Sequence, residues 1–296
     1  MKIEQNVAVG RLTTVGIGGA ARHFARPGTL AELQEALVWA AGRGLDVFTI
    51  GLGSNLLVAD AGVDALVLRL EDELAKAEVV DELLVAGGGA TNAVSLHRAR
   101  DAGLGGFEFA CAIPGTIGGG VMMNAGAYGG DWKRILERAL VVAADAADWR
   151  TPAELGLEYR RSGLRPGEIV AVAEFRLASR PPDEIKATVA ELQAQRKAAQ
   201  PTNRRTFGSV FKNPGHELSA GRMLEACGLL GHRIGGAQIS PRHANFIENA
   251  GGARAEDAIA LMAEARRRAL EEYGVDLEHE VRFVGAIELP AVGQSV

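Results

Sequence analysis

The segment GSVFKNP at 208–214 places a hydroxyl, an ammonium and an amide within five residues, on Ser209, Lys212 and Asn213. Ser209 is not part of a Gly-x-Ser-x-Gly elbow, and the chain shows no Ser-His-Asp order, which disfavours a hydrolytic nucleophile. A positioned serine can still donate a proton when its acceptor is strongly basic and close. The segment therefore indicates a polar ligand site rather than the nucleophile of a hydrolase.

The segment GLGSN at 51–55 directly follows a strand-like run at 47–50. It is not the dinucleotide fingerprint, because Leu56 stands where a third glycine is required, and it is not a Walker loop, because no Gly-Lys-Ser/Thr follows. The N–H groups of such a turn, with the side chains of Ser54 and Asn55, can cradle a pyrophosphate. A plain tight turn is an equally good interpretation of this segment alone.

A second glycine-rich loop covers IPGTIGGG at 113–120 and continues to MNAGAYG at 123–129. Two such loops from neighbouring units suggest a large ligand between them. A flat isoalloxazine ring suits these walls, because glycine admits the ring and backbone N–H groups can bond its atoms. The alternative is close backbone packing at a domain seam.

Charge and composition exclude several kinds of partner. The net charge of −5 disfavours nucleic acid. The six histidines show no metal-binding spacing and no HExxH motif occurs, so we expect no metal. Cys111 and Cys227 lie far apart without a CxxC motif, which favours a reducing, cytoplasmic location.

The uncharged stretch at 109–130 is long enough to cross a bilayer and contains a GxxxG pattern. It also contains Pro114, Asn124 and seven glycines, and it has few large aliphatic residues to face lipid. A buried loop that wraps a ligand fits this composition better than a membrane span. The N-terminal residues MKIEQN lack the apolar run of a signal peptide.

Hydrophobic periodicity and turn residues predict an α+β protein of three lobes. TLAE at 29–32 has the form of a capping box and starts a helix that ends near Gly42. The other elements predicted for the first two lobes are strands at 47–50, 65–70, 83–86, 140–142 and 168–177, and a helix at 91–102.

The third lobe follows a proline-bearing boundary at 180–182. Its predicted elements are helices at 183–200, 219–227 and 255–273, and strands at 237–240, 245–248 and 281–284. We place the lobes at residues 1–70, 71–180 and 181–296.

The motifs, in their order along the chain, resemble those of the UDP-N-acetylenolpyruvoylglucosamine reductases, flavoenzymes of bacterial peptidoglycan synthesis. The resemblance covers about residues 10–288 and implies two lobes that bind FAD as vanillyl-alcohol-oxidase-like flavoproteins do, and a third, substrate-binding lobe. The motifs that carry it are GLGSNLLV at 51–58, IPGTIGG at 113–119, MNAGAYG at 123–129, YRRS at 159–162, GSVFKNP at 208–214, AGRMLEACGLLGHRIGGAQIS at 220–240, HANFIEN at 243–249 and EVRF at 280–283.

Carried over by motif, the catalytic residues would be Arg160, Ser209 and Glu280. The resemblance implies that NADPH reduces FAD, that flavin N5 gives a hydride to C3 of the enolpyruvyl substrate, and that Ser209 protonates C2 to give UDP-N-acetylmuramate. A guanidinium matches the carboxylate on which charge then develops. Glu280, beside that anion, is expected to carry a proton. Read alone, Arg160 and Glu280 would pass for surface charges.

The resemblance also implies which residues contact the two small molecules. The cofactor contacts would be Gly51, Leu52, Gly53, Ser54, Asn55, Leu56, Ile113, Pro114, Gly115, Thr116, Gly118, Gly119, Asn124, Gly126 and Ala127. The substrate contacts would be Tyr128, Tyr159, Lys212, Asn213 and His243.

The chain departs from the family pattern at three places. Val15 and Gly16 stand where a basic or aromatic pair is frequent, so a cofactor contact is expected to be absent there. The interval between the Tyr-Arg and Gly-Ser motifs contains no Tyr, as in a shorter form of the family, and Arg204 and Arg205 are candidates to contact the substrate phosphates instead. His279 precedes the catalytic Glu, and we expect its ring to be exposed rather than to tune that carboxyl.

Two other functions stay open from the sequence. A flavin oxidase of the same cofactor-binding class would reoxidise its flavin with oxygen, without an enolpyruvyl sugar. A flavin- or nucleotide-sugar-binding regulator would bind flavin without consuming NADPH. The joint presence of Arg160, Ser209 and Glu280 counts against both, since a pure binder needs no proton donor.

Overall fold

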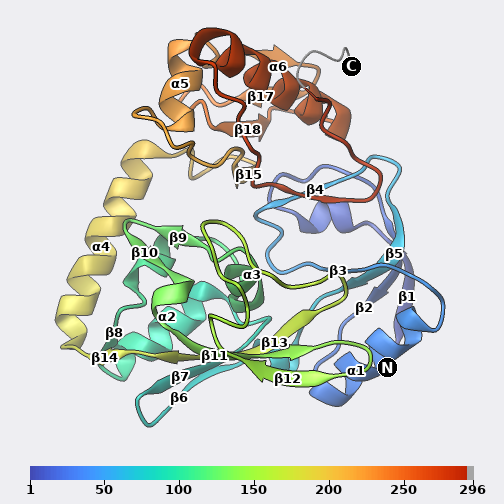
Figure 1. Cartoon of the computed structure of the whole chain (residues 1–296), viewed down its shortest axis with the longest axis vertical. Coiled ribbons are helices and arrows are strands. Elements are labelled where there is room, and N and C mark those ends of the chain that lie inside the picture. Colours follow the sequence, from blue (N-terminus) through green and yellow to red (C-terminus); the bar gives the residue numbers. More distant parts are fainter. Residues whose placement is uncertain (292–296) are drawn as a thin grey trace. The chain divides into compact units, whose positions relative to one another are not determined.

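The computed structural model describes residues 1–291 and confirms the predicted α+β class (Figure 1). By compactness the chain divides into two units. The first comprises residues 1–5, 23–52 and 65–196, and the second comprises residues 6–22, 53–64 and the chain from 197 onward. The predicted lobes at 1–70 and 71–180 thus fall largely into one compact unit, and two short N-terminal segments group with the predicted third lobe.

A four-stranded sheet and one helix lie near the N-terminus, and most of their residues belong to the first unit. Helix α1 (Leu30–Ala41) buries Leu33 and Leu37 in a core shared with Leu66 and Leu68 of the sheet. The strand order is β1-β2-β5-β3, with β1 at Ile3–Val7, β2 at Ala21–Ala25, β5 at Val63–Leu68 and β3 at Val47–Thr49. The predicted helix and its two following strands are therefore confirmed.

Helix α1 begins where the sequence predicts, with one difference in its cap. Thr29 is the N-cap, and its hydroxyl accepts a hydrogen bond from the Glu32 N–H. The Glu32 carboxylate accepts from the Gly28 N–H at 2.7 Å, one residue before the N-cap. The predicted capping box is thus confirmed in one half and displaced by one residue in the other.

A five-stranded antiparallel sheet carries the larger core of the first unit. Helices α2 (Asn92–Asp101) and α3 (Ile117–Met122) pack on it. The Phe107 ring meets the rings of Trp132 and Phe175 edge to face, with centroids 5.6 and 5.4 Å away. The strand order is β12-β11-β13-β7-β6, with β12 at Ala147–Arg150, β11 at Leu136–Val142, β13 at Ile169–Arg176, β7 at Leu83–Gly87 and β6 at Ala77–Val80.

Short pairs and a long helix complete the first unit. The predicted helix at 183–200 is confirmed as α4 (Pro182–Ala199), whose last three residues group with the second unit. The pairs are β8 (Leu104–Gly105) with β14 (Ala178–Ser179), and β9 (Gly126–Ala127) with β10 (Gly130–Asp131).

The second unit is built on a four-stranded antiparallel sheet and two helices. Helix α5 (Ala220–Ala226) and helix α6 (Ala255–Tyr273) bury Met223, Leu261 and Met262 in its core. Helix α6 ends at Gly274 with φ +66°, as predicted. The strand order is β15-β18-β17-β16, with β15 at Thr206–Ser209, β18 at Phe246–Asn249, β17 at Ala237–Ile239 and β16 at Arg233–Ile234; β4 (Leu56–Val58) pairs in parallel with β19 (Arg282–Val284).

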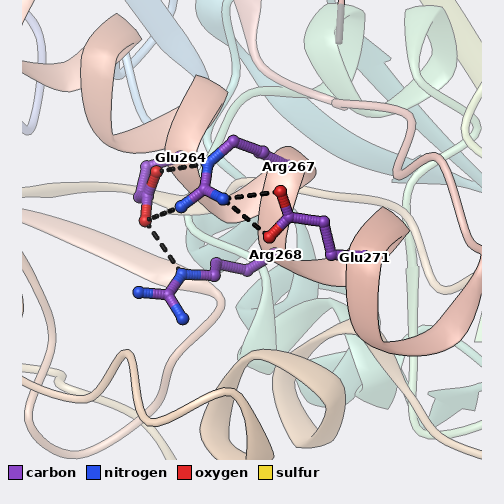
Figure 2. A network of polar contacts seen from close by, with 4 residues as sticks. All are labelled: Glu264, Arg267, Arg268 and Glu271. Atoms are coloured by element: carbon purple, nitrogen blue, oxygen red, sulfur yellow. Dashed lines mark hydrogen bonds and ion pairs between the residues drawn. The ribbon is translucent and has the colours of Figure 1, made fainter. Parts of the chain in front are cut away.

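Two arginines of α6, Arg267 and Arg268, are paired with carboxylates of the same helix (Figure 2). Arg267 bonds Glu264 on one side and Glu271 on the other, and Arg268 also bonds Glu264. The hydrogen bond that Arg267 donates to Glu264 is the main cause that raises the pKa of Arg267. Such i,i+3 and i,i+4 pairs support a helix face, so these arginines form a solvated face and not a binding patch.

The sequence left a membrane span at 109–130 as the poorer interpretation. Among the helices of residues 1–291, none has the length and apolar character that a bilayer span needs. Most of this stretch lies in the 3-10 helix Glu108–Ala112, helix α3 and the β9–β10 pair.

Candidate functional site

Arg160 lies in a tight turn of the first unit. The turn is closed by a bridge between Glu158 and Arg161, whose backbones exchange hydrogen bonds of 2.9 and 3.2 Å. The Arg160 Nη2 atom donates to the Gly126 carbonyl at 2.5 Å, and its guanidinium lies 5.0 Å from the centroid of the Tyr159 ring. The plane of the guanidinium is therefore fixed by one carbonyl and one aromatic face.

Asn124 connects this turn to the loop that precedes it in sequence. Its side chain is buried, the Nδ2 atom donates to the Glu158 carbonyl at 2.9 Å, and the Oδ1 atom accepts from the Lys133 N–H at 2.9 Å. The carboxamide predicted to contact the cofactor is thus engaged by the backbone of two loops. In this structure it joins the loop at 124–133 to the turn that carries Arg160.

Backbone strain concentrates around the same residues. A positive φ is tolerated by Asn and Asp but is costly for bulky side chains. Strained conformations of this kind persist where surrounding structure enforces them, and they cluster at functional sites. In residues 1–291 the non-glycine residues with positive φ are Asn6, Asp72 and Asp81, away from the predicted site, and Asn124 (φ +36°), Tyr128 (φ +50°) and Arg160 (φ +55°) within it.

Two glycines in this region are required by space. A Cβ at Gly126 would lie 2.6 Å from the Gly130 carbonyl oxygen and 3.1 Å from Arg160 Nη1. A Cβ at Gly130 would lie 2.4 Å from the Phe109 ring. The β9–β10 pair is therefore packed tightly enough that only glycine allows the Arg160 side chain to reach its carbonyl partner.

The two predicted cofactor loops meet in the first unit at Gly51 and Thr116. A Cβ at Gly51 would lie 2.4 Å from Thr116 Oγ1, so glycine is needed for the close approach. Gly118 also packs closely, since its Cβ would lie 3.0 Å from the Gly88 carbonyl oxygen. Both readings of these glycines, close packing and a ligand wall, are compatible with this geometry.

A cleft of about 300 Å³ lies beside these loops, within the first unit. This is at the lower end of the size of small-molecule sites, which is roughly 300–1,000 Å³. Its wall includes Asn92, whose buried Oδ1 atom has no hydrogen-bond partner within residues 1–291. The lining residues are Leu52, Thr91, Asn92, Ala93, Leu96, His97, Arg100, Ala110, Cys111, Ile113, Pro114, Gly115, Lys186, Val189, Gln193 and Arg196.

The chemistry of this cleft suits an anionic ligand with a flat or apolar part. Lys186, Arg100 and Arg196 bring cationic groups to it, and Ile113 and Pro114 bring apolar surface. Burial raises the pKa of the Cys111 thiol, so this cysteine is a neutral part of the wall at pH 7.

Ser209 is the last residue of β15 in the second unit. It pairs with Phe246 of β18, and the register shifts between Ser209 and Thr206, where the strand takes up one extra residue. Gly208, in this irregular part, has φ +79°. The strand therefore leaves its regular ladder at the serine, as bulged strands do beside functional sites.

Glu280 is joined to the Ser209 segment through its backbone. The Glu280 N–H donates to the Val210 carbonyl at 2.9 Å, and the Asn55 Nδ2 atom donates to the Glu280 carbonyl at 2.9 Å. The Arg282 N–H in turn donates to the Asn55 carbonyl at 3.0 Å. The structure thus brings Ser209 and Glu280 together in the second unit, while Arg160 belongs to the first, and Asn55 uses one amide hydrogen to hold Glu280.

The other predicted substrate residues of the second unit have partners in the protein. Lys212 Nζ lies 2.5 Å from a carboxylate oxygen of Glu278, and Asn213 Oδ1 accepts the Ala220 N–H at 3.2 Å. Burial lowers the pKa of His243, whose Nδ1 atom accepts a hydrogen bond from a backbone N–H two residues on. Ligand contacts of these three side chains stay predictions.

The predicted tyrosines lie in the first unit. Tyr128 and Tyr159 are 44% and 54% exposed. This exposure is compatible with substrate contacts, which stay predictions.

The expected exposure of His279 is wrong. Its ring stacks on the Phe283 ring with centroids 4.6 Å apart, and its Nδ1 atom lies 2.9 Å from the Val281 carbonyl oxygen. Burial lowers the pKa of this imidazole. His279 therefore packs against the start of β19 and supports the strand that follows Glu280.

Arg204, proposed as a phosphate contact, faces a carboxylate. Its Nε atom lies 3.8 Å from the buried carboxylate of Glu248. Its guanidinium is largely exposed, so its role toward substrate phosphates stays a prediction, as does that of Arg205. In the described part of the chain no group of three or more His, Cys, Asp and Glu is placed to hold a metal ion.

Sequence reasoning missed Asn245, although it lies within a motif that was recognised. Its carboxamide bonds both backbone groups of Phe211, two residues after Ser209. An asparagine before a short strand gives no signal in sequence that it faces its own backbone rather than a ligand.

Two family models match this chain. One, described as the C-terminal domain of UDP-N-acetylenolpyruvoylglucosamine reductase, matches residues 200–284, and one described as an FAD binding domain matches residues 21–147. A protein named UDP-N-acetylenolpyruvoylglucosamine reductase 2, from Symbiobacterium thermophilum, is 43% identical over 278 residues, which are 93% of this chain and 90% of the relative.

Further relatives agree. A UDP-N-acetylenolpyruvoylglucosamine reductase from Rubrobacter xylanophilus is 41% identical over 277 residues, 93% of each chain. The crystal structure of UDP-N-acetylenolpyruvylglucosamine reductase (MurB) from Thermus caldophilus superposes with a TM-score of 0.83 at 38% identity, covering 96% of this chain and 99% of that one.

Proposed function

The chain belongs to the UDP-N-acetylenolpyruvoylglucosamine reductase family, and from that premise we propose its reaction and the roles of its residues. The protein is an FAD-dependent oxidoreductase of peptidoglycan synthesis. NADPH is the proposed reductant, UDP-N-acetylglucosamine enolpyruvate the substrate and UDP-N-acetylmuramate the product. The proposed steps assign one role to each of Arg160, Ser209 and Glu280.

The residues around the cleft of the first unit fit the cofactor. The orphaned Asn92 Oδ1 atom offers a buried acceptor, and Lys186 and Arg196 supply positive charge suited to a pyrophosphate. Ile113 and Pro114 supply apolar surface suited to a flat ring. Bound FAD would supply the hydride acceptor for NADPH and the hydride donor for C3 of the enolpyruvyl group.

Arg160 would stabilise the charge that develops on the substrate carboxylate when C3 receives the hydride. A guanidinium binds a carboxylate through two parallel N–H groups. The Gly126 carbonyl and the Tyr159 ring hold its plane before the reaction begins, so little reorganisation is needed.

Ser209 would then deliver a proton from its hydroxyl to C2. Glu280, held through its backbone to Val210, would lie beside the same substrate and carry a proton while the anion is bound. The observation that carries this proposal is the joining of the Ser209 and Glu280 segments by the Glu280 N–H and the Asn55 amide. These bonds fix the backbone from which both side chains extend.

Stopped-flow absorbance tests the function directly. The enzyme is reduced with NADPH under anaerobic conditions, UDP-N-acetylglucosamine enolpyruvate is added, and the return of the oxidised flavin absorbance is followed. We expect fast, substrate-dependent reoxidation. A flavin that is reoxidised only by oxygen would contradict the proposal and favour an oxidase.

The variant Ser209→Ala tests the proton donor. Flavin reduction by NADPH is expected to stay near the wild-type rate, while reoxidation by the enolpyruvyl substrate slows by roughly 10²–10⁴-fold. The matched control is Ser219→Ala, which removes the N-cap hydroxyl of α5 and should lower stability by about 1 kcal/mol without changing either half-reaction. Equal losses in both half-reactions of Ser209→Ala would indicate a structural role instead.

A further inference from the structure

Asn245 is a buried residue just before β18, with 4% of its surface exposed. Its Oδ1 atom accepts the Phe211 N–H at 2.9 Å, and its Nδ2 atom donates to the Phe211 carbonyl at 2.8 Å. Its own backbone carbonyl accepts the Val210 N–H at 2.9 Å. Three hydrogen bonds therefore join this residue to the two residues that follow Ser209.

The Ser209 segment needs such a partner because it has left the sheet. Strand β15 ends at Ser209, after a register shift that begins at Thr206. Beyond it no ladder with β18 continues, yet the Phe211 peptide groups are buried and must be bonded. The Asn245 carboxamide supplies one acceptor and one donor in the places where a neighbouring strand would have supplied them.

The opposite side of the segment is held by the residues around Glu280. The Glu280 N–H donates to the Val210 carbonyl, and the Lys212 N–H donates to the Glu278 carbonyl, both at 2.9 Å. The backbone on the C-terminal side of Ser209 is thus fixed from two sides, by Asn245 and by the 278–280 segment. On the Asn245 side both bonds to Phe211 come from one side chain, so one substitution can remove them, while the bond from the Val210 N–H to the Asn245 carbonyl stays.

We propose that Asn245 is a positioning residue that sets the place of the Ser209 hydroxyl through the Phe211 peptide. It acts on the proton transfer without contacting the substrate. This inference rests on the proposed role of Ser209. Proton transfer depends steeply on the geometry of donor and acceptor, so a displacement of about 1 Å can slow it by as much as 10²-fold.

The substitution Asn245→Asp gives a test with a pH signature. A protonated carboxyl has one O–H donor and one carbonyl acceptor and can bond both Phe211 groups, whereas a carboxylate only accepts. We expect flavin reoxidation by the enolpyruvyl substrate, taken relative to wild type at the same pH, to fall roughly 10- to 100-fold at high pH and to recover as the pH is lowered. Flavin reduction by NADPH should be unchanged.

Asn249→Asp is the matched control. Asn249 is the last residue of β18, which Asn245 precedes, and its carboxamide also bonds backbone as donor and acceptor, donating to the Val15 carbonyl and accepting the Gly251 N–H, both at 3.1 Å. These bonds do not touch the Ser209 segment. Its reoxidation rate relative to wild type should show no recovery at low pH.

A second variant keeps the proposal testable if Asn245→Asp does not fold. Asn245→Ser is too short to reach both Phe211 groups, so it should slow reoxidation at every pH. In the Ser209→Ala background neither change at Asn245 should slow reoxidation further, because the residue acts through that hydroxyl. A further loss of tenfold or more in this background would overturn the proposal.

Hydrogen exchange gives a readout that is independent of activity. The Phe211 amide of the wild-type protein should be protected, and Asn245→Ser should lose at least tenfold of that protection while Asn249→Asp retains it. Unchanged protection would overturn the proposal that the Asn245 carboxamide holds the Phe211 peptide. If wild-type reoxidation by the substrate is absent but the Phe211 protection behaves as expected, the proposed function is wrong, while the role of Asn245 in holding the Phe211 peptide is supported.

Discussion

Arg160 and Ser209 are both held by a buried asparagine that bonds backbone, yet the two regions differ in how relaxed the backbone is. Asn124 bonds the turn of Arg160, and positive φ falls on Arg160 in that turn and on Asn124 and Tyr128 in the loop bonded to it. Asn245 bonds the segment of Ser209, where the positive φ falls on Gly208, a residue that adopts it without strain.

This difference predicts different responses to mutation. A strained turn adopts its conformation only while surrounding bonds enforce it, at a cost of about 1–3 kcal/mol per strained residue. When those bonds are lost, the Arg160 turn should relax to another conformation. The Ser209 segment has a relaxed backbone, so losing Asn245 should loosen its position without changing its conformation.

Among the changes that test this difference, removal of the Arg160 side chain should have the largest effect. Arg160→Gly and Arg160→Ala should both slow flavin reoxidation by substrate roughly 10²–10³-fold, since both lose the guanidinium. Because only glycine is relaxed at φ +55°, Arg160→Gly should be more stable than Arg160→Ala by about 1 kcal/mol. Denaturant unfolding measures the second effect, and an order in which alanine is the more stable would show that the turn is not strained.

Glu168 is bonded by Arg150 and Arg165, which flank Arg160 in sequence, so it tests how the chain segment that carries Arg160 is held. Burial raises the pKa of its carboxyl, but hydrogen bonds from Arg150 and from Arg165 outweigh this and lower the pKa to about 2. Since the pKa is depressed on folding, the stabilisation is present above about pH 4.5 and is lost as the pH falls toward 2. Its full size is on the order of 3 kcal/mol.

Glu168→Gln should therefore lower the free energy of unfolding by up to about 3 kcal/mol at pH 7. The difference between wild type and variant should shrink as the pH is lowered from 5 to 3. Urea unfolding at both pH values measures it. A difference that is independent of pH would mean that the two arginines do not stabilise the ionised carboxylate, and the Arg160 segment would then be held by its turn alone.

Sequence reasoning identified the residues of both regions but not the way they are held. Helix α6 was predicted with the correct bounds, because its apolar period is long and Gly274 ends it. The positive φ of Arg160 and Tyr128 could not be predicted, because it results from tertiary bonds that override local preference. In the same way, the amide groups of Asn55, Asn124 and Asn245 are visible in the sequence, but their direction is decided by which backbone groups the fold leaves unpaired.

The smallest expected effect separates two tyrosines of the same site. Tyr128 has φ +50°, whereas Tyr159 is not among the positive-φ residues of the described chain. Tyr128→Gly should therefore be more stable than Tyr128→Ala by about 1 kcal/mol, while Tyr159→Gly should be less stable than Tyr159→Ala by about 0.5–1 kcal/mol. Each pair removes the same side chain, so lost contacts cancel and denaturant unfolding reports the backbone term. The same sign at both positions would mean that the strain around Arg160 is not stored in the backbone, and the contrast with the Ser209 segment would then rest on hydrogen bonds alone.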